Sequence, residues 1–271
     1  EEPLKALVFA DACVDVNSQS SAAQEISGAA SLPLHGSSLL HWQLYVLARS
    51  GVDEAIVLSS RPRDDLPTSP VLGCLKVTAL SNATWCSPGD ALREVESRVA
   101  LRPRHDFVIV HHGTLFNMDV AAMVRSHKQR CKADRNWLVT LTLRNGVAYT
   151  PLVTAMQTET GALCFYSDAA SLDEVSLDAK GDNAGLRFGG TVQISADVVD
   201  IGLDICSPDF LIEFRENFDF DNVRDYVRAK LDGGEAELLG NRIYAHFVDS
   251  HASEYATRID SFGAYMTASR D

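Results

Sequence analysis

The chain has 271 residues, of which 46% are hydrophobic and 23% charged, and its formal net charge is −13. This length suffices for one large α/β domain with a buried core. The acidic balance argues against unaided binding to nucleic acid or anionic membrane, because both reward clustered lysine and arginine. No secretory signal opens the chain and no apolar run approaches a membrane span of ~20 residues. We therefore expect a cytoplasmic protein with no nucleic acid or membrane partner.

The six cysteines contain no Cys-x-x-Cys pair, and zinc sites and disulfide frameworks need closer or more patterned spacing. We expect reduced cysteines, most of them in the core, and neither a bound metal nor a cofactor.

The first half of the chain alternates strand and helix patterns. The helix that begins near residue 38 has one broad apolar face and ends at Gly51, and Pro88-Gly89-Asp90 opens the next helix. Strands separated by single helices predict parallel βαβ units. We expect strands at 4–10, 54–59, 74–80 and 106–111, and helices at 38–49, 88–100 and 118–131.

The second half has more strand than helix. Two Val/Thr/Leu-rich stretches, 136–144 and 147–156, bracket Arg144-Asn145-Gly146 and predict a hairpin. Ser207-Pro208-Asp209 opens a helix that runs to Phe218. Further strands are expected at 162–167, 186–194, 198–205 and 242–248, a surface loop at 177–190, and helices at 221–231 and 261–271. The whole pattern, 1–271, predicts a single α/β domain with three α/β/α layers around a mixed, mostly parallel sheet with a small antiparallel part.

The turn after the first strand is unusual for a nucleotide-binding protein. In α/β folds this turn is normally glycine-rich, so that the backbone can wrap phosphates. Here it reads Ala10-Asp11-Ala12-Cys13-Val14-Asp15, with two carboxylates where an anion would sit. The strand at 106–111 leads to Gly113-Thr114, where a metal-dependent enzyme would carry Gly-Asp. The pattern indicates an enzyme scaffold without catalytic residues.

The order strand, loop, Ser31-Leu32-Pro33-Leu34, helix, Gly51 resembles the opening of the sugar nucleotidyltransferase family. The resemblance implies a Rossmann-like nucleotidyltransferase fold. Active members carry Lys-Pro where this chain has Ala29-Ala30, and their Mg²⁺ aspartate falls at Thr114. The positions that match the family's nucleotide pocket, vestigial here, are Ala10, Asp11, Ala12, Ala29, Gly89, Asp90, Gly113 and Thr114.

One branch of that family is more similar, namely the epsilon subunits of eukaryotic translation initiation factor 2B. The segments 204–208, 217–228, 238–243 and 253–258 carry this resemblance, and 217–243 is the most specific. It implies the noncatalytic N-terminal domain of a longer subunit, which continues into a β-helix and a helical-repeat domain that exchanges guanine nucleotide on initiation factor 2. It also implies assembly with the gamma subunit and the other subunits of the exchange factor, with initiation factor 2 bound through the full-length protein.

Other interpretations remain open. An active or nucleotide-sensing sugar-phosphate nucleotidyltransferase would need metal carboxylates, for which only Asp260 is available beside Thr114. The homologous gamma subunit shares the fold, although the segment 217–243 argues against it. His111 and His112 follow the strand, and we expect one of them in the core and the other bonded to a loop. The charged residues 219–225 predict a helix start with an exposed charged face.

Overall fold

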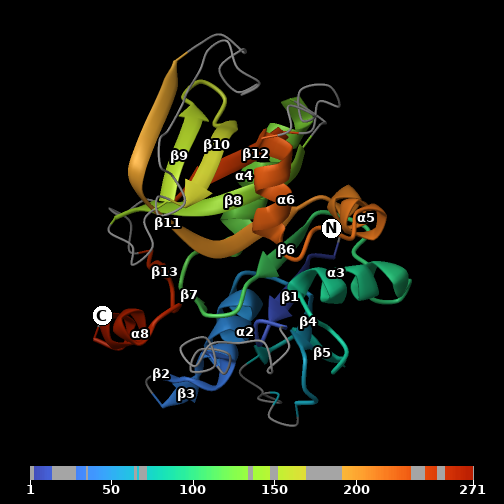
Figure 1. Ribbon diagram of the computed structural model, residues 1–271. Coiled ribbons are helices and arrows are strands. Elements are labelled where there is room, and N and C mark those ends of the chain that lie inside the picture. The colour runs from blue at the N-terminus through green and yellow to red at the C-terminus, as the bar shows by residue number, and fades with distance from the viewer. Residues whose placement is uncertain are drawn as a thin grey trace.

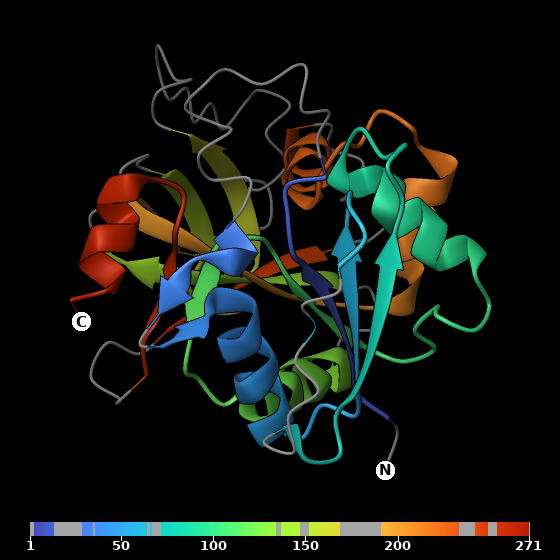
Figure 2. The same ribbon diagram turned by 90° about the horizontal axis from the view of Figure 1, so that it is seen from below.

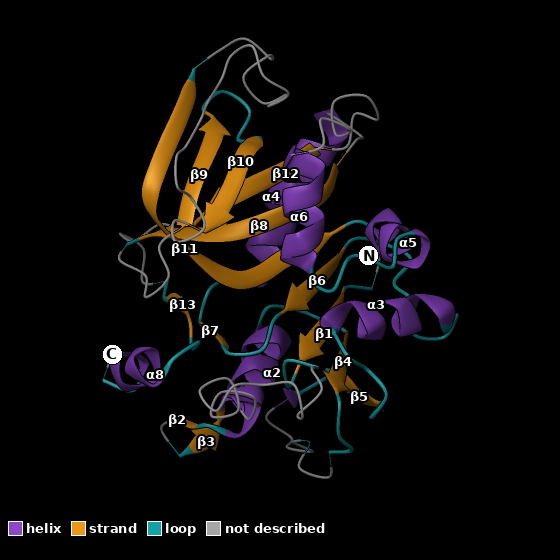
Figure 3. Cartoon of the chain, in the orientation of Figure 1, coloured by secondary structure: helices purple, strands orange, loops and turns teal. Residues whose placement is uncertain are grey.

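The structure is a computed structural model that describes residues 3–13, 29–34, 36–63, 66, 72–133, 137–146, 152–168, 191–232, 242–248 and 254–270. Nine strands within these residues form one sheet, and helices cover both of its faces (Figures 1 and 3). The predicted α/β fold with a mixed sheet is therefore confirmed. Among the described residues, no helix is both long and apolar enough to cross a bilayer.

Four strands form the parallel half of the sheet. Their order is β6 (Phe107–Val110), β1 (Lys5–Phe9), β4 (Glu54–Ser59) and β5 (Lys76–Ser81), with every neighbouring pair parallel. The strands β1, β4 and β6 are buried on both faces, which explains why they read as nearly continuous apolar runs. The predicted strands of the first half are confirmed within two residues at each end.

Alternate side chains of β1 enter two different cores. Leu7 and Phe9 pack with helices α3 (Pro88–Ser97), α5 (Pro208–Glu216) and α6 (Val223–Asp232). Ala6 and Val8 pack on the opposite face with α2 (Leu39–Arg49) and α4 (Val120–Ala133). In Figure 2, α2 and α4 lie on one side of the central strands and α3 and α5 on the other. The three predicted layers are therefore present.

The starts of α2 and α3 follow capping signals in the sequence, whereas Ser207 before α5 makes no side-chain capping bond. The Ser38 hydroxyl accepts a hydrogen bond from the His41 N–H at the start of α2, and Ser87 forms a capping box with Asp90 at α3. Gly51, just beyond α2, has φ +76°, as a glycine that ends a helix should.

A long strand, β11 (Val192–Cys206), joins the parallel half to the rest of the sheet. It pairs antiparallel with β6, with β8 (Trp137–Asn145) and with β9 (Leu152–Gln157), which in turn pairs with β10 (Leu163–Asp168). Val198 faces both Asn145 of β8 and Leu152 of β9, so β11 lies between these two strands. The predicted hairpin of 136–144 with 147–156 is therefore wrong.

The strand predicted at 198–205 and the described end of the one predicted at 186–194 are parts of this one strand, whereas residues 186–190 lie outside the described residues. Its pairing shifts between Asp200 and Asp204, where Gly202 has φ +76°. The predicted loop 177–190 lies outside the described residues. β12 (Arg242–Phe247) pairs parallel with β8. A separate small sheet pairs β13 (Ala256–Arg258) with β7 (Thr114–Phe116), and helix α8 (Phe262–Ala268) follows β13. Before α2, β2 (Pro33–Leu34) pairs with β3 (Ser37–Ser38).

The cysteines are all free thiols, but fewer of them are buried than predicted. Cys13 and Cys206 are buried, Cys131 and Cys164 are half-buried, and Cys74 and Cys86 are exposed.

Candidate functional site

The candidate site is the edge of the sheet where the parallel strands β1, β4 and β6 end. Ala10, Asp11 and Ala12 follow β1, whereas Gly113 and Thr114 follow β6, the neighbour of β1. Ala29 begins a short 3₁₀ helix that ends at Ser31. Ligands of open α/β sheets bind at this edge, which is why the residues there decide what the fold can do.

Asp11 fills the turn after β1 with its own carboxylate. Its oxygens accept hydrogen bonds from the backbone N–H groups of Cys13 (2.9 Å) and Ser60 (3.0 Å), and from the hydroxyls of Ser59 (2.8 Å) and Ser60 (2.9 Å). The carboxylate therefore accepts the hydrogen bonds of the N–H and hydroxyl groups at the ends of β1 and β4. Asp15, the second carboxylate of the predicted turn, lies outside the described residues. Burial, followed by the charge of Asp11, raises the pKa of the Cys13 thiol, which keeps it protonated.

Thr114 is fully buried where β6 turns into β7. Its hydroxyl oxygen lies 3.0 Å from the carbonyl oxygens of both Ile201 and Gly202 in β11, so the hydroxyl donates to this pair. Gly113, one residue earlier, has φ +77° and accepts a hydrogen bond of 2.7 Å from the N–H of Ile259. Asp260 follows Ile259 directly and is exposed. Asp260 therefore lies one residue beyond the hydrogen bond between Ile259 and Gly113.

Gly89 and Asp90 hold a helix against a loop. The N–H of Gly89 donates to the carbonyl of Asp221 (2.6 Å), and a Cβ at Gly89 would lie 2.3 Å from the carbonyl oxygen of Phe220. The Asp90 carboxylate accepts from the N–H of Cys86 (2.8 Å) and bonds to the guanidinium of Arg93 (2.9 Å). Arg93 in turn donates to four carbonyl oxygens, that of Phe214 in α5 and those of Asn217, Phe218 and Phe220 in the loop that follows it.

A buried ionic network lies beside the ends of β6 and β11, and sequence reasoning missed it. Arg224 of α6 bonds to the carboxylates of Asp200 (2.6 Å) and Asp204, both on β11. The Tyr166 hydroxyl donates to Asp200 (2.5 Å), and His111 Nε2 lies 2.8 Å from Asp204. Arg224 is 8% exposed, so the predicted exposed charged face at 219–225 is wrong at this residue.

Opposite charges within the network keep Asp200 and Arg224 ionised although both are largely buried. Burial alone would raise the pKa of Asp200, but the adjacent Arg224 guanidinium holds it well below the usual range. Burial would likewise lower the pKa of Arg224, but Asp200 and Asp204 raise it. The signal in the sequence was the pair Asp200 and Asp204 within the apolar run of β11, because a charged group in a buried strand requires a partner.

The two histidines after β6 have different environments. His111 is buried, stacks on Phe9 with ring centroids 5.9 Å apart, and bonds to Asp204, whereas His112 is half-buried. Burial lowers the pKa of both histidines, to about 3 at His112, where Arg258 and His111 add to the effect. At His111 the Asp204 carboxylate opposes the effect of burial without overcoming it.

We therefore expect the protein to lose stability on mild acidification. Above the ordinary histidine pKa of 6.5 both histidines are neutral in the folded and unfolded states, and they add no pH dependence. Below it the unfolded state binds more protons, so the free energy of unfolding falls by up to about 1.4 kcal/mol per pH unit for each such histidine. Urea unfolding between about pH 5 and pH 8 measures this slope. The variant His111→Gln should flatten it, and equal slopes in both proteins would contradict the assignment.

Comparison with known proteins finds sequences that are similar to this chain. No family model matches the chain. The chain is 26% identical over 258 residues to translation initiation factor eIF2B subunit epsilon of Schizosaccharomyces pombe, covering 89% of this chain and 36% of that protein. It is 26% identical over 255 residues to the same subunit of Dictyostelium discoideum, covering 89% of this chain and 34% of the relative. The chain thus spans about a third of the length of the curated relatives it matches.

The fold is similar to that of sugar nucleotidyltransferases. A candidate glucose-1-phosphate thymidylyltransferase from Bacillus anthracis superposes with a TM-score of 0.65 at 10% identity, covering 98% of this chain and 94% of that one. The inositol-1-phosphate CTP transferase from T. maritima gives a TM-score of 0.59 at 11% identity, covering 97% and 92%. The resemblance to epsilon subunits, with a nucleotidyltransferase-like fold, is therefore confirmed.

Proposed function

We propose that this chain is the noncatalytic, nucleotidyltransferase-like domain of an epsilon subunit of the guanine nucleotide exchange factor for translation initiation factor 2. In this proposal residues 1–271 form one domain of a longer subunit, and the exchange activity resides in a C-terminal part of the parent protein. The domain acts in the cytoplasm in subunit assembly and in the regulation of translation initiation. Its partners are the gamma subunit and the other subunits of the factor, with initiation factor 2 bound through the full-length protein.

The position of Thr114 carries the noncatalytic part of this proposal. Nucleotidyl transfer needs a metal ion at the phosphate, and Mg²⁺ favours anionic oxygen ligands. The Thr114 hydroxyl is fully buried and donates to the carbonyls of Ile201 and Gly202. A carboxylate at this position would face the same two carbonyl oxygens, so the local packing of β11 disfavours a metal ligand there.

The Asp11 carboxylate supports the same conclusion from the neighbouring strand. The N–H groups of Cys13 and Ser60, which could bond to a phosphate at the ends of β1 and β4, already bond to Asp11. A nucleotide phosphate would have to displace this internal anion. The proposal therefore treats Ala10, Asp11, Ala12, Ala29, Gly89, Asp90, Gly113 and Thr114 as the remains of a nucleotide pocket.

Affinity purification of the full-length parent protein from its own cells, followed by mass spectrometry, tests the assembly role. We expect recovery of the other exchange-factor subunits together with initiation factor 2. Recovery of the protein alone, or with sugar-metabolic enzymes, would overturn the proposal.

The fold similarity favours one alternative, an active or nucleotide-sensing sugar-phosphate nucleotidyltransferase. A ligand at ~100 times its dissociation constant would stabilise the folded chain by about 2.7 kcal/mol, a measurable shift in melting temperature. We expect no shift with Mg²⁺ and nucleoside triphosphates or sugar phosphates. A saturable shift that the variant Asp11→Ala alters would instead support a working nucleotide site.

A further inference from the structure

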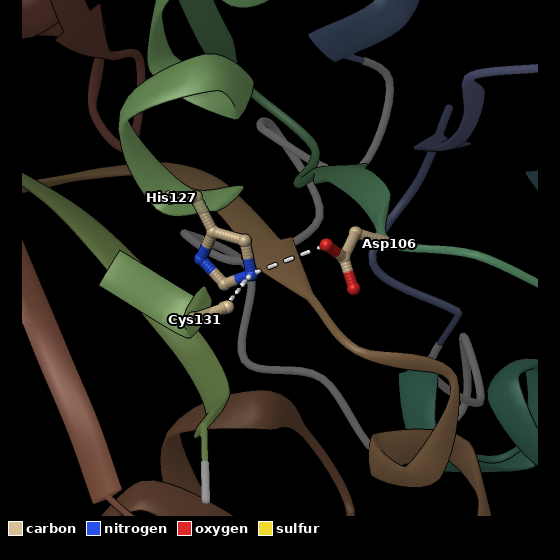
Figure 4. Close-up of side chains that lie close together, drawn as sticks. All are labelled: Asp106, His127 and Cys131. Carbon is tan, nitrogen blue, oxygen red and sulfur yellow. Dashed lines mark hydrogen bonds and ion pairs between the residues drawn. The ribbon is translucent and has the colours of Figure 1, made fainter. Parts of the chain in front are cut away.

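Three side chains with metal-binding atoms meet at the end of β6 opposite to Gly113 and Thr114. Asp106 immediately precedes β6, whereas His127 and Cys131 lie one helical turn apart on α4. Figure 4 shows the imidazole of His127 between the other two side chains. One ligand atom from each residue lies within 4.8 Å of the other two. His127 and Cys131 are four residues apart in the sequence, whereas only the fold brings Asp106 to them.

The distances suit a transition metal ion. His127 Nε2 lies 3.4 Å from the Cys131 sulfur and 3.8 Å from an oxygen of Asp106. Nitrogen, sulfur and oxygen ligands of tetrahedral Zn²⁺ stand about 2.0–2.3 Å from the ion, which places them about 3.3–3.6 Å from one another. Small side-chain adjustments would therefore admit the ion at the centre of the three atoms.

A hydrogen bond to Thr140 orients the imidazole of His127 for metal binding. Its side chain is fully buried, and its Nδ1 lies 2.8 Å from the hydroxyl oxygen of Thr140 on β8. A metal on Nε2 requires the proton to sit on Nδ1, and the Thr140 oxygen can accept that proton's hydrogen bond.

We propose that Asp106, His127 and Cys131 bind a Zn²⁺ ion, with Thr140 orienting the imidazole. The carboxylate and the thiolate would supply two negative charges to balance the ion, and water would complete the tetrahedron. The ion would tie the start of β6 to the last turns of α4, on the face of the sheet that α2 and α4 cover. This function is separate from the proposed role in subunit assembly and does not depend on it.

Metal content and Co²⁺ substitution of the purified chain test the proposal. After dialysis with excess Zn²⁺ and then without metal, we expect about one equivalent of Zn²⁺ per chain. Replacement by Co²⁺ should give the near-ultraviolet charge-transfer absorption of a cobalt–thiolate bond. The Cys131→Ser variant should lose this absorption, whereas Cys164→Ser, which changes a half-buried cysteine on β10, should keep it.

Two gentler variants keep the test informative if Cys131→Ser folds poorly. Asp106→Asn preserves shape at a side chain that is 22% exposed, and it should weaken Zn²⁺ binding. Thr140→Val should weaken it roughly 10–100-fold, as removal of an orienting partner does in other metal sites. Absence of bound Zn²⁺ and of the absorption in the unmodified chain would overturn the proposal, and would leave an ordinary hydrogen bond between Cys131 and His127. An absorption that persists unchanged in Cys131→Ser would also overturn it.

Discussion

Replacing Arg224 with methionine is expected to lower the free energy of unfolding by about 3–5 kcal/mol, because it leaves two buried carboxylates without their cation. Asp204 is fully buried, the Asp200 side chain is 12% exposed, and the Arg224 guanidinium contacts both. Urea denaturation of the variant and the unmodified chain at neutral pH measures the difference.

Arg228 provides a matched control one turn further along α6. Its guanidinium pairs with Asp168, but the two side chains are 35% and 44% exposed, so water screens the pair. Arg228→Met should therefore cost less than about 1 kcal/mol. Adding Asp200→Asn and Asp204→Asn to Arg224→Met should recover part of the loss, since the stranded charges are then gone. Equal, small effects at Arg224 and Arg228 would show that the buried network is not a major source of stability.

Replacing Gly113 with alanine is expected to destabilise the fold by about 2–5 kcal/mol. The backbone at Gly113 has φ +77°, where an L-residue costs roughly 1–2 kcal/mol. A Cβ there would also lie 2.5 Å from the carbonyl oxygen of Ile259, and such overpacking typically adds about 1–3 kcal/mol. Thermal and urea unfolding of the variant measure the combined effect.

Gly51 separates the two contributions. It has nearly the same backbone conformation, φ +76°, but a Cβ there would meet no atom within 4 Å. Gly51→Ala should therefore show only the conformational cost of about 1–2 kcal/mol. If both variants lose the same stability, the close approach of the Ile259 backbone to Gly113 is not a constraint on the fold.

The local elements could be predicted well from the sequence because their signals are local. Capping residues at Ser38 and Ser87 and the glycine at 51 mark helix ends directly. The pairing of strands is a different matter. β8 and β9 have the composition of a hairpin, yet β11 lies between them, because it can pair with both and with β6. The apolar pattern within a segment does not show which distant strand that segment will pair with.

Part of the candidate site could also be predicted from the sequence. The turns after β1 and β6 could be placed at one sheet edge from parallel topology alone. What the side chains do there depends on distant segments: Asp11 bonds to residues after β4, and Thr114 bonds to β11. The network of Arg224 likewise joins residues from separate elements, so no spacing along the chain revealed it. In the group around His127, Cys131 lies one turn further along α4, but Asp106 precedes β6 and is brought to the pair only by the fold.

The position of β6 in the sheet has a consequence for how the chain is made. β6 is apolar and fully buried, and its two neighbours are β1, which precedes it, and β11, which follows much later. During synthesis at about 5–20 residues per second, the interval between residues 110 and 206 lasts about 5–20 s. Throughout that time β6 lacks β11, and an unpaired apolar strand edge is a template for pairing with other chains. The order of strands thus leaves β6 without its second neighbour until β11 has been made, and exposes the nascent chain to aggregation there.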